Sequence, residues 1–368
     1  MTHAITPSQA AQLLQADAAR QTVIGSLANE AANASAFSDY QQDKPANTLR
    51  RQAGDLAVFA RYLSVLHFYT LDADKDADAQ HKANAARLMS DPAAWAAITY
   101  GLINGFVKWQ LQQGYAVGSI NVRLSTVKRY VKLAFQAGSL DTEQAAKIGT
   151  VKGFAYGNRT DIDERRTEDG YETRKGDKKA AAVALNKAQR ADLMTQPDTP
   201  QGRRDTLLMS LLLEHGLRCG EIAALDVTAF AFERTYQSGT FTFYRKKVRK
   251  WQTHKLTRRS LQAAHAYFES DAPGMGKLLR GSLKNGELSN DGMSERAITK
   301  RVNVLGEKIG IVSLSAHDGR HSAATEVARQ KDITLNRMVE MFGWNSPAMA
   351  LSYIEAAAIA NEGVDFED

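Results

Sequence analysis

Four short stretches in the second half of the sequence carry side chains that can bind a phosphate or react with it. The first is GLRCGE at 216–221, which follows a strongly apolar helical run, so Arg218 leaves the edge of a buried core in a fixed position. A guanidinium held in this way can donate to two phosphate oxygens at once, and Glu221 can orient it. An arginine–glutamate ion pair that only joins two helices explains this stretch equally well.

The second stretch is SAHDGRH at 315–321, in which a serine and the aspartate three residues later predict the start of a helix. His317, Arg320 and His321 then share one face at the helix N-terminus, and together they can hold a phosphate. The two histidines stand four residues apart, as metal ligands do, but a cation lies between them and no zinc-protease glutamate accompanies them, so no metal is expected. A histidine packed in a core is the alternative, and it applies more to His321 than to His317.

The third stretch, FGWNSPAMALSY at 342–353, ends in a tyrosine. Ser346 and Pro347 predict a helix start, which places Tyr353 about two turns into the helix. A tyrosine on an alanine-rich helix normally belongs to a core or its rim. Its phenol, with an ordinary pKa of about 10, becomes a nucleophile only where cations stabilise the phenolate or a base takes the proton. The other stretches therefore decide its role.

The fourth stretch, GTFTFYRKKVRKWQTHKLT at 239–257, alternates with period two and predicts a β-hairpin. No acidic residue interrupts its basic side chains, so it is suited to follow a phosphate backbone. A β-turn can also place one lysine in a cleft as a general acid, whereas a solvated basic strand is the alternative for most of these side chains. The basic set, which continues to residue 259, is Arg245, Lys246, Lys247, Arg249, Lys250, Lys255, Arg258 and Arg259.

Taken in chain order, these stretches resemble the catalytic motifs of the tyrosine recombinase family, also called phage integrases. The resemblance covers roughly residues 180–356. GLRCGEIAALDV resembles the first arginine motif and SAHDGRHSAAT the second. FGWNSPAMALSYIE is similar to the last motif, with Trp344 nine residues before the tyrosine, where members carry His or Trp. The catalytic set that the resemblance implies is Tyr353, Arg218, Arg320, His317, Lys247 and Trp344, with Glu221 and His321 in support.

The resemblance implies a site-specific recombinase or integrase in which Tyr353 attacks a DNA phosphate and forms a 3′-phosphotyrosine. Arg218 and Arg320 would hold the non-bridging oxygens and offset the charge that grows in the transition state. His317 would assist proton transfer with the tyrosine, and Trp344 would pack beside the phosphate. The scheme needs no cofactor and no metal.

The hairpin lysine that protonates the leaving 5′-oxygen is expected to be Lys247, with Lys246 and Lys250 as rivals. A type IB topoisomerase or a telomere resolvase shares the same residue set and is one alternative activity. A DNA-binding regulator that keeps the scaffold without the chemistry is another, although every reactive residue type is present in the sequence.

The family also implies a fold class that is mainly α with a small β-sheet: a helical core-binding domain and a mixed α/β catalytic domain that form a C-shaped clamp on DNA. Amphipathic helical periodicity supports the first domain, with apolar sets at 56–66, 98–109 and 120–135. The predicted divisions are an N-terminal arm of unknown role at 1–45, the core-binding domain at 46–152, a linker at 153–180, the catalytic domain at 181–353 and a tail at 354–368. The expected DNA contacts are Arg245, Lys246, Arg249 and Lys250 on the hairpin, and Arg123 and Lys128 in the helical domain.

Composition agrees with a globular DNA-binding protein in a reducing compartment. The chain of 368 residues is 43% hydrophobic and 24% charged, with a net charge of +6 and a pI of about 9.2. Cys219 is the only cysteine, which excludes an internal disulfide and a cysteine-rich zinc module. No secretion signal or membrane span of roughly 20 apolar residues is seen, so a cytoplasmic, DNA-associated protein is expected.

The expected partner is double-stranded DNA with a specific target site. Accessory proteins are possible further partners. The tail at 354–368 contains five acidic residues and no basic one, which makes it unsuited to bind DNA. It resembles the segment by which family members dock on a neighbouring protomer, so a homotetramer on DNA is expected.

Overall fold

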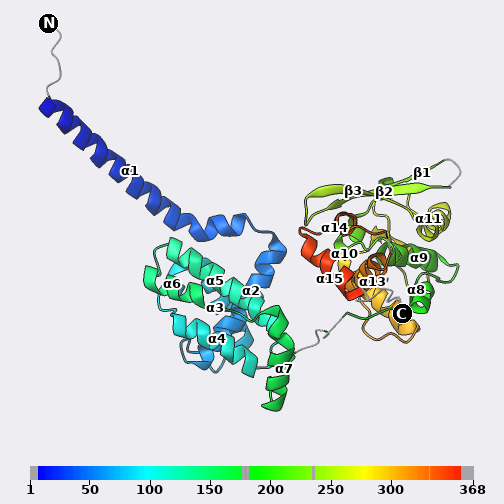
Figure 1. Cartoon of the computed structure of the whole chain (residues 1–368), viewed down its shortest axis with the longest axis horizontal. Helices are drawn as coiled ribbons and strands as arrows, with labels where there is room; N and C mark the ends of the chain where they lie inside the picture. Colours follow the sequence, from blue (N-terminus) through cyan, green and yellow to red (C-terminus); the bar gives the residue numbers. More distant parts are fainter. Residues whose placement is uncertain (1–6, 176–178, 180–181, 234–236, 331, 358–368) are drawn as a thin grey trace, which may run out of the picture. The chain divides into compact units, whose positions relative to one another are not determined.

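The computed structural model describes residues 7–175, 179, 182–233, 237–330 and 332–357, and the chain divides into two compact units, 1–180 and 181–368 (Figure 1). The N-terminal unit is helical, and the C-terminal unit combines helices with small antiparallel sheets. The predicted fold class, mainly α with a small β-sheet, is confirmed. Among the described residues, no helix has both the length and the apolar content that a membrane crossing needs.

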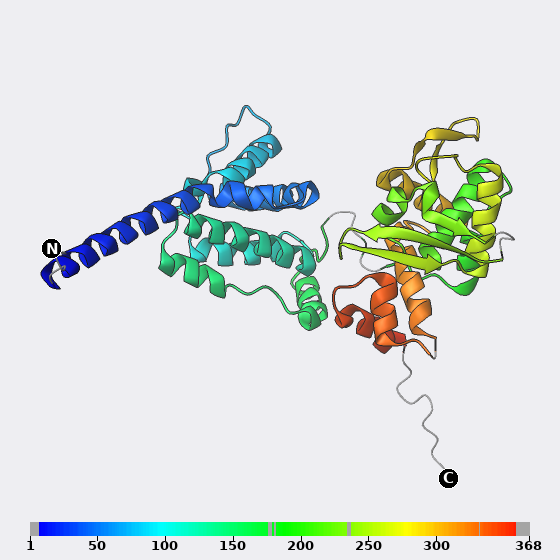
Figure 2. The ribbon, with the colours of Figure 1, turned by 90° about the horizontal axis from the view of Figure 1, so that it is seen from above.

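The N-terminal unit begins with α1 (Pro7–Gln42), a helix of 36 residues in the arm that the sequence left unassigned. Its first part extends away from the other helices of the unit (Figure 2). Phe37, near its end, is buried and contacts the Tyr130 ring. The other elements are α2 (Ala46–Val65), α3 (Ala77–Ser90), η1 (Pro92–Trp95), α4 (Tyr100–Gln112), α5 (Val117–Gln136), α6 (Thr142–Thr150), η2 (Tyr156–Asn158) and α7 (Arg159–Glu168).

Two details of this unit differ from the sequence-based expectations. Phe135, the last member of the predicted apolar set on α5, is exposed and lies one residue before the end of the helix. The segment predicted as linker, 153–180, contains α7, whose Arg166 is buried and donates to the carbonyls of Leu111 and Glu172. These contacts hold α7 on the N-terminal unit.

The C-terminal unit is built around α9 (Pro200–Leu213), a buried helix that packs against α11 (Arg258–Ser270) and α13 (Ala316–Ala328). The predicted hairpin is confirmed as β2 (Gly239–Arg245) and β3 (Lys250–Lys255), and β1 (Phe230–Phe232) pairs with the other edge of β2. The remaining elements are α8 (Lys187–Leu193), α10 (Cys219–Ala224), η3 (Val227–Ala229), β4 (Arg280–Ser282), β5 (Leu288–Gly292), α12 (Glu295–Lys308), α14 (Leu335–Phe342) and α15 (Pro347–Ala357).

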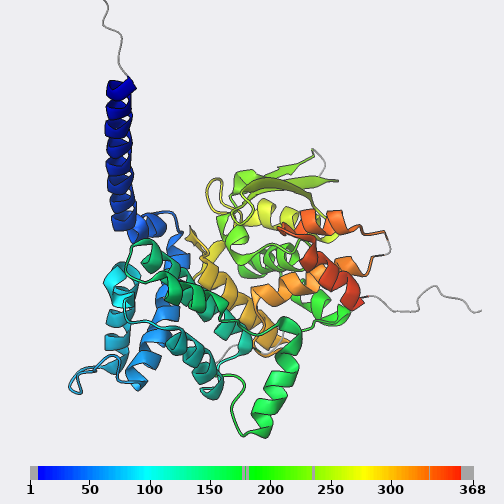
Figure 3. The same cartoon turned by 60° about the vertical axis from the view of Figure 1, so that its left-hand side comes forward.

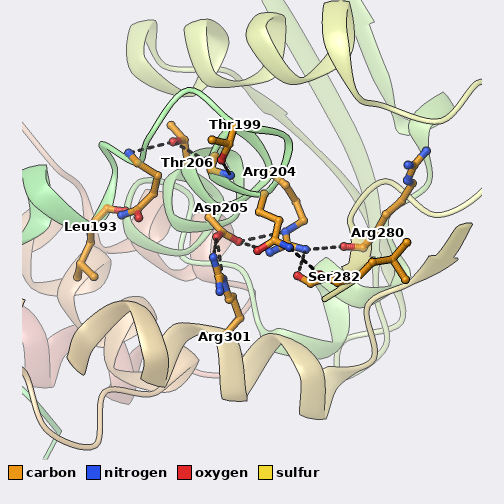
Figure 4. Close-up of polar contacts among 12 residues, drawn as sticks. Leu193, Thr199, Arg204, Asp205, Thr206, Arg280, Ser282 and Arg301 are labelled. Atoms are coloured by element: carbon orange, nitrogen blue, oxygen red, sulfur yellow. Dashed lines mark hydrogen bonds and ion pairs between the residues drawn. The ribbon is translucent and has the colours of Figure 1, made fainter. Parts of the chain in front are cut away.

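A buried ionic network ties α9 to α12 and to the β4–β5 hairpin (Figure 4). Arg204 and Asp205 are fully buried, and Arg204 donates to Asp205 Oδ1, to the carbonyl of Arg280 and to Ser282 Oγ. Arg301 of α12 donates to the other oxygen of Asp205. Because each buried charge has a partner of opposite charge, the network holds the N-terminal half of α9 in place and leaves no buried ion unpaired.

The last three helices gather on one side of the C-terminal unit (Figure 3). The capping box predicted at the start of α13 is confirmed, since Ser315 Oγ accepts from the Asp318 N–H and Asp318 Oδ2 accepts from the Ser315 N–H at 2.7 Å. The predicted helix start at Pro347 is confirmed as the first residue of α15. These local signals fix where both helices begin, and so how many residues separate each helix start from His317, Arg320 and Tyr353.

Candidate active site

Six of the side chains singled out in the sequence line one pocket of the C-terminal unit, with a volume of about 370 Å³: Arg218, Glu221, Lys246, Lys247, His317 and Arg320. Its cationic side chains come from α10, the hairpin turn and α13, and two carboxylates, Glu221 and Glu295, line it as well. Four cations therefore face two anions, which makes the pocket suited to bind an anion. The lining residues are Leu217, Arg218, Cys219, Gly220, Glu221, Tyr244, Lys246, Lys247, Glu295, Ala316, His317 and Arg320.

Arg218 is held by Glu221 on one side and by the end of α14 on the other. Its Nη1 donates to Glu221 Oε1 at 2.8 Å, and its Nη2 donates to the Gly343 carbonyl at 3.3 Å. Glu221 Oε2 also accepts from the Arg218 backbone N–H at 2.8 Å. The Arg218 side chain is 27% exposed, so its guanidinium can donate further hydrogen bonds toward the pocket.

Arg320 lies deeper than Arg218. Its Nη1 donates to the Gly216 carbonyl at 2.6 Å, and its Nη2 donates to the Phe342 carbonyl. Burial and the nearby charges of Arg218 and Arg245 lower the pKa of Arg320 to about 9, which leaves it protonated at neutral pH. A negative group in the pocket would relieve this repulsion.

The turn between β2 and β3 carries the lysines. Lys246 and Lys247 both line the pocket and are exposed, while Lys250 begins β3 and does not line it in the described structure. Arg249 adopts the left-handed conformation, with φ of 52°, and both Arg249 and Lys250 are exposed. The geometry thus retains Lys247 and Lys246 as candidate acids.

Tyr353 does not line the pocket; its ring is stacked on that of Trp344 beside it. Its ring stacks on Trp344 at 5.5 Å between centroids, and the Arg320 guanidinium lies 5.9 Å from the Trp344 ring. The Tyr353 hydroxyl lies 2.6 Å from Nδ1 of His321. Burial raises the pKa of Tyr353, and the charge of Arg320 opposes that shift.

The histidines therefore divide between two positions. His317 is exposed and lines the pocket, whereas His321 is half-buried and contacts the Tyr353 hydroxyl. Burial, with the neighbouring His317, lowers the pKa of His321, so its imidazole is neutral at pH 7 and can accept a proton. The resemblance implies that His317 would assist the tyrosine with His321 in support, whereas the imidazole that contacts the Tyr353 hydroxyl in the structure is that of His321.

One sequence-based expectation is wrong: Arg245 does not face solvent as a DNA contact. Its side chain is 1% exposed, and its Nη1 donates to both oxygens of Glu221 at 3.0 and 2.9 Å. The period-two pattern could have revealed this, since Arg245 falls on the same face as Phe241 and Phe243, both buried in the core. Grouping Arg245 with the basic residues that follow it, Lys246 and Lys247, leaves this alternation out of account.

The N-terminal unit has a second basic cavity, of about 1130 Å³, lined by residues of α1, α2, α5, the end of α6 and the segment that follows α6. Lys128 lines it, but its Nζ also donates to the carbonyls of Gly149 and Val151, which caps the end of α6. Arg123 lies over the Tyr115 ring at 4.1 Å and is not in this cavity. The cationic side chains that line the cavity are Arg51, Lys128, Arg129, Lys132 and Lys152.

Within the described residues, no cluster of three or more His, Cys, Asp or Glu side chains is arranged to hold a metal ion. His317 and His321 contact each other edge-to-face, at 4.7 Å between ring centroids. His321 is already engaged with the Tyr353 hydroxyl. The predicted protomer contact in the tail, 354–368, lies largely outside the described residues and stays a prediction.

Residues 184–358, nearly all of the C-terminal unit, match the model of the phage integrase family. No curated protein sequence matches the chain.

Two solved structures share the fold. One is the Tn1549 transposon integrase in complex with a circular intermediate DNA, with 14% sequence identity and a TM-score of 0.53, covering 81% of this chain and 94% of that chain. The other is the same integrase in complex with transposon right end DNA, with the same identity, coverage and TM-score. At this identity the likeness concerns the fold.

Proposed function

Residues 184–358 form a domain of the phage integrase family, and from this premise we propose that the chain is a site-specific DNA recombinase that cuts and rejoins DNA through a covalent 3′-phosphotyrosine at Tyr353. The observation that carries the proposal is the pocket in which Arg218, Lys247, His317 and Arg320 converge, beside a tyrosine whose hydroxyl contacts a neutral imidazole. The solved structures that share the fold are DNA complexes, which supports DNA as the substrate.

In the proposed reaction the Tyr353 oxygen attacks phosphorus, and the phenol proton passes to His321. The bond from phosphorus to the 5′-oxygen breaks, and Lys247 gives a proton to the leaving oxygen. One phosphate ester replaces another, so the bond energy is retained for the reverse step. Because the phenol pKa is raised rather than lowered in the unliganded protein, a base at the hydroxyl is required.

Arg218 and Arg320 would hold the two non-bridging oxygens. Both already have protein partners that fix their orientation, so little reorganisation is needed when charge develops on the phosphate. His317 is exposed at the same pocket and can donate a further hydrogen bond. Since Tyr353 does not line the pocket wall in the described structure, DNA binding must bring the phosphate and the phenol together.

Binding of the duplex would use basic side chains in both units. Lys246, Arg249 and Lys250 are exposed on the hairpin, and Lys128 and Lys132 line the basic cavity of the N-terminal unit. Such contacts are made mainly to phosphates and depend on salt. A homotetramer and a C-shaped clamp on DNA are further parts of this proposal.

A direct test captures the covalent intermediate. The chain is incubated with a pool of nicked duplexes whose centre is randomised, so that loss of the short strand beyond the nick traps any adduct, and denaturant-resistant complexes are isolated and sequenced. We expect a recovered consensus and a nucleotide mass on the peptide that contains Tyr353. Tyr353→Phe keeps the ring stack on Trp344 and removes only the hydroxyl, so it should give no adduct.

Tyr244 is the matched control because it lines the pocket itself and is exposed. Tyr244→Phe should retain adduct formation, and an adduct that instead depends on Tyr244 would refute the assignment of the nucleophile. Relaxation of supercoiled plasmid without any sequence preference would favour a topoisomerase. Sequence-specific DNA binding with no adduct would favour a regulator.

A further inference from the structure

Arg245 is a buried arginine that joins three separate parts of the candidate site. Besides its two hydrogen bonds to Glu221, its Nη2 donates to the Met341 carbonyl at 2.6 Å and its Nε donates to Gln252 Oε1. The residue ends β2, its neighbour on the chain is Lys246, and Gln252 lies on β3. It therefore connects the base of the lysine turn, the carboxylate on α10 and the end of α14.

Glu221 is the link between Arg245 and Arg218. Its carboxylate is 6% exposed and receives two hydrogen bonds from Arg245 and one from the Arg218 side chain. Because Arg245 binds both carboxylate oxygens, Arg218 makes a single side-chain contact with Glu221. A planar guanidinium can grip a carboxylate with two donors, so this arrangement keeps part of Arg218 free.

We propose that Arg245 is a positioning residue for Arg218: by satisfying the charge of Glu221, it prevents Glu221 from binding Arg218 in a bidentate pair and leaves that guanidinium for the scissile phosphate. The inference rests on the proposed recombinase function. Arg245 itself does not line the pocket and is 1% exposed, so it acts on a bound phosphate through the residues that it holds and not by contact.

The charge balance makes the inference specific. Removal of Arg245 leaves a buried carboxylate with Arg218 as its remaining described side-chain cation, and such a carboxylate draws that cation toward itself. The defect is then a buried carboxylate that competes with the phosphate for Arg218. Glu221→Gln removes that negative charge, so the double variant should recover part of what Arg245→Met loses. A purely structural role predicts the opposite, since a second change in the same buried network would add to the damage.

Arg204 provides a matched control from the same unit. It is also fully buried and also shares a carboxylate with a second arginine, but its partners Asp205, Ser282 and the Arg280 carbonyl do not line the pocket (Figure 4). Arg204→Met should lower the melting temperature and leave the cleavage rate of the folded protein unchanged.

The experiment measures single-turnover adduct formation on a nicked duplex selected as above, at a temperature where each variant is folded by circular dichroism. Arg245→Met should slow adduct formation by about tenfold or more, as expected when an electrostatic donor is misplaced, while affinity for the duplex changes by less than about threefold. Arg245→Met with Glu221→Gln should be faster than Arg245→Met alone. Arg245→Lys retains a charge, so its rate of adduct formation should lie between those of the wild type and Arg245→Met. If Arg245→Met does not fold, Arg245→Lys takes its place in the comparison.

Either of two results overturns the inference: an unchanged cleavage rate in the folded Arg245 variants, or a double variant slower than the single one. A wild-type chain that forms no adduct with any duplex contradicts the recombinase proposal instead. The two failures are thus distinguishable.

Discussion

Gly343→Ala tests whether Arg245 is held as tightly as its contacts indicate. Gly343 ends α14 in the left-handed conformation, with φ of 55°, and a Cβ at this position would lie 2.4 Å from Arg245 Cδ and 2.8 Å from its Nε. The left-handed conformation costs a residue with a Cβ about 1–2 kcal/mol. Displacing a packed side chain adds about 1–3 kcal/mol. We therefore expect the free energy of unfolding of the C-terminal unit to fall by about 2–5 kcal/mol.

Gly310→Ala separates the two contributions. Gly310 follows α12 with φ of 75°, and a Cβ there would meet nothing within 4 Å, so only the backbone cost of about 1–2 kcal/mol applies. Hydrogen exchange of the buried amides of α9 reports unfolding of this unit alone. Equal losses in the two variants would refute the reasoning, because they would mean that Arg245 moves aside freely.

Three further predictions concern stability. Asp205→Asn should cost about 3–5 kcal/mol, because Arg204 loses a fully buried carboxylate partner; a smaller shift in urea unfolding than Lys128→Met produces would contradict this. Lys128→Met should cost about 1 kcal/mol in the N-terminal unit, through its carbonyl contacts on α6, and pulse proteolysis can measure it. Burial lowers the pKa of His215 to about 3 and that of His254 to about 4, while the unfolded chain still protonates near 6.5. Stability should thus be complete above pH 6.5 and fall by about 1.4 kcal/mol per histidine for each pH unit below it, down to the folded pKa values. Unfolding free energies that stay constant from pH 7.5 to 5 would exclude this coupling.

The parts of the fold that local patterns encode could be predicted from the sequence. A serine and an aspartate three residues apart are enough to start α13, and Pro347 fixes φ at the first turn of α15, so both helices begin where expected. The alternation of Phe241 and Phe243 with polar neighbours likewise gave the hairpin. In each case the residues that determine the element are only a few positions apart in the sequence.

Contacts between distant segments could not be predicted in this way. The partners of Arg245 are 24 and 96 residues away at Glu221 and Met341, and no local pattern states that these segments meet. The charge of Lys128 predicts a DNA contact, but no local pattern shows that its Nζ also donates to the Gly149 carbonyl, 21 residues away. Net charge along a strand or helix thus says which side chains are basic, while the fold decides which of them stay exposed.

The arrangement of charge around Glu221 explains why this site should prefer an anion. Arg218, Arg245 and Arg320 lie close enough for their charges to interact, and burial with this repulsion lowers the pKa of both Arg245 and Arg320. One carboxylate cannot balance three guanidinium groups, so the unliganded site carries an excess of positive charge that works against folding. A phosphate in the pocket relieves that repulsion, and a transition state with more negative charge relieves it further. Under the proposed function, the charges that reduce stability without DNA would therefore be the ones that favour the reaction when DNA is bound.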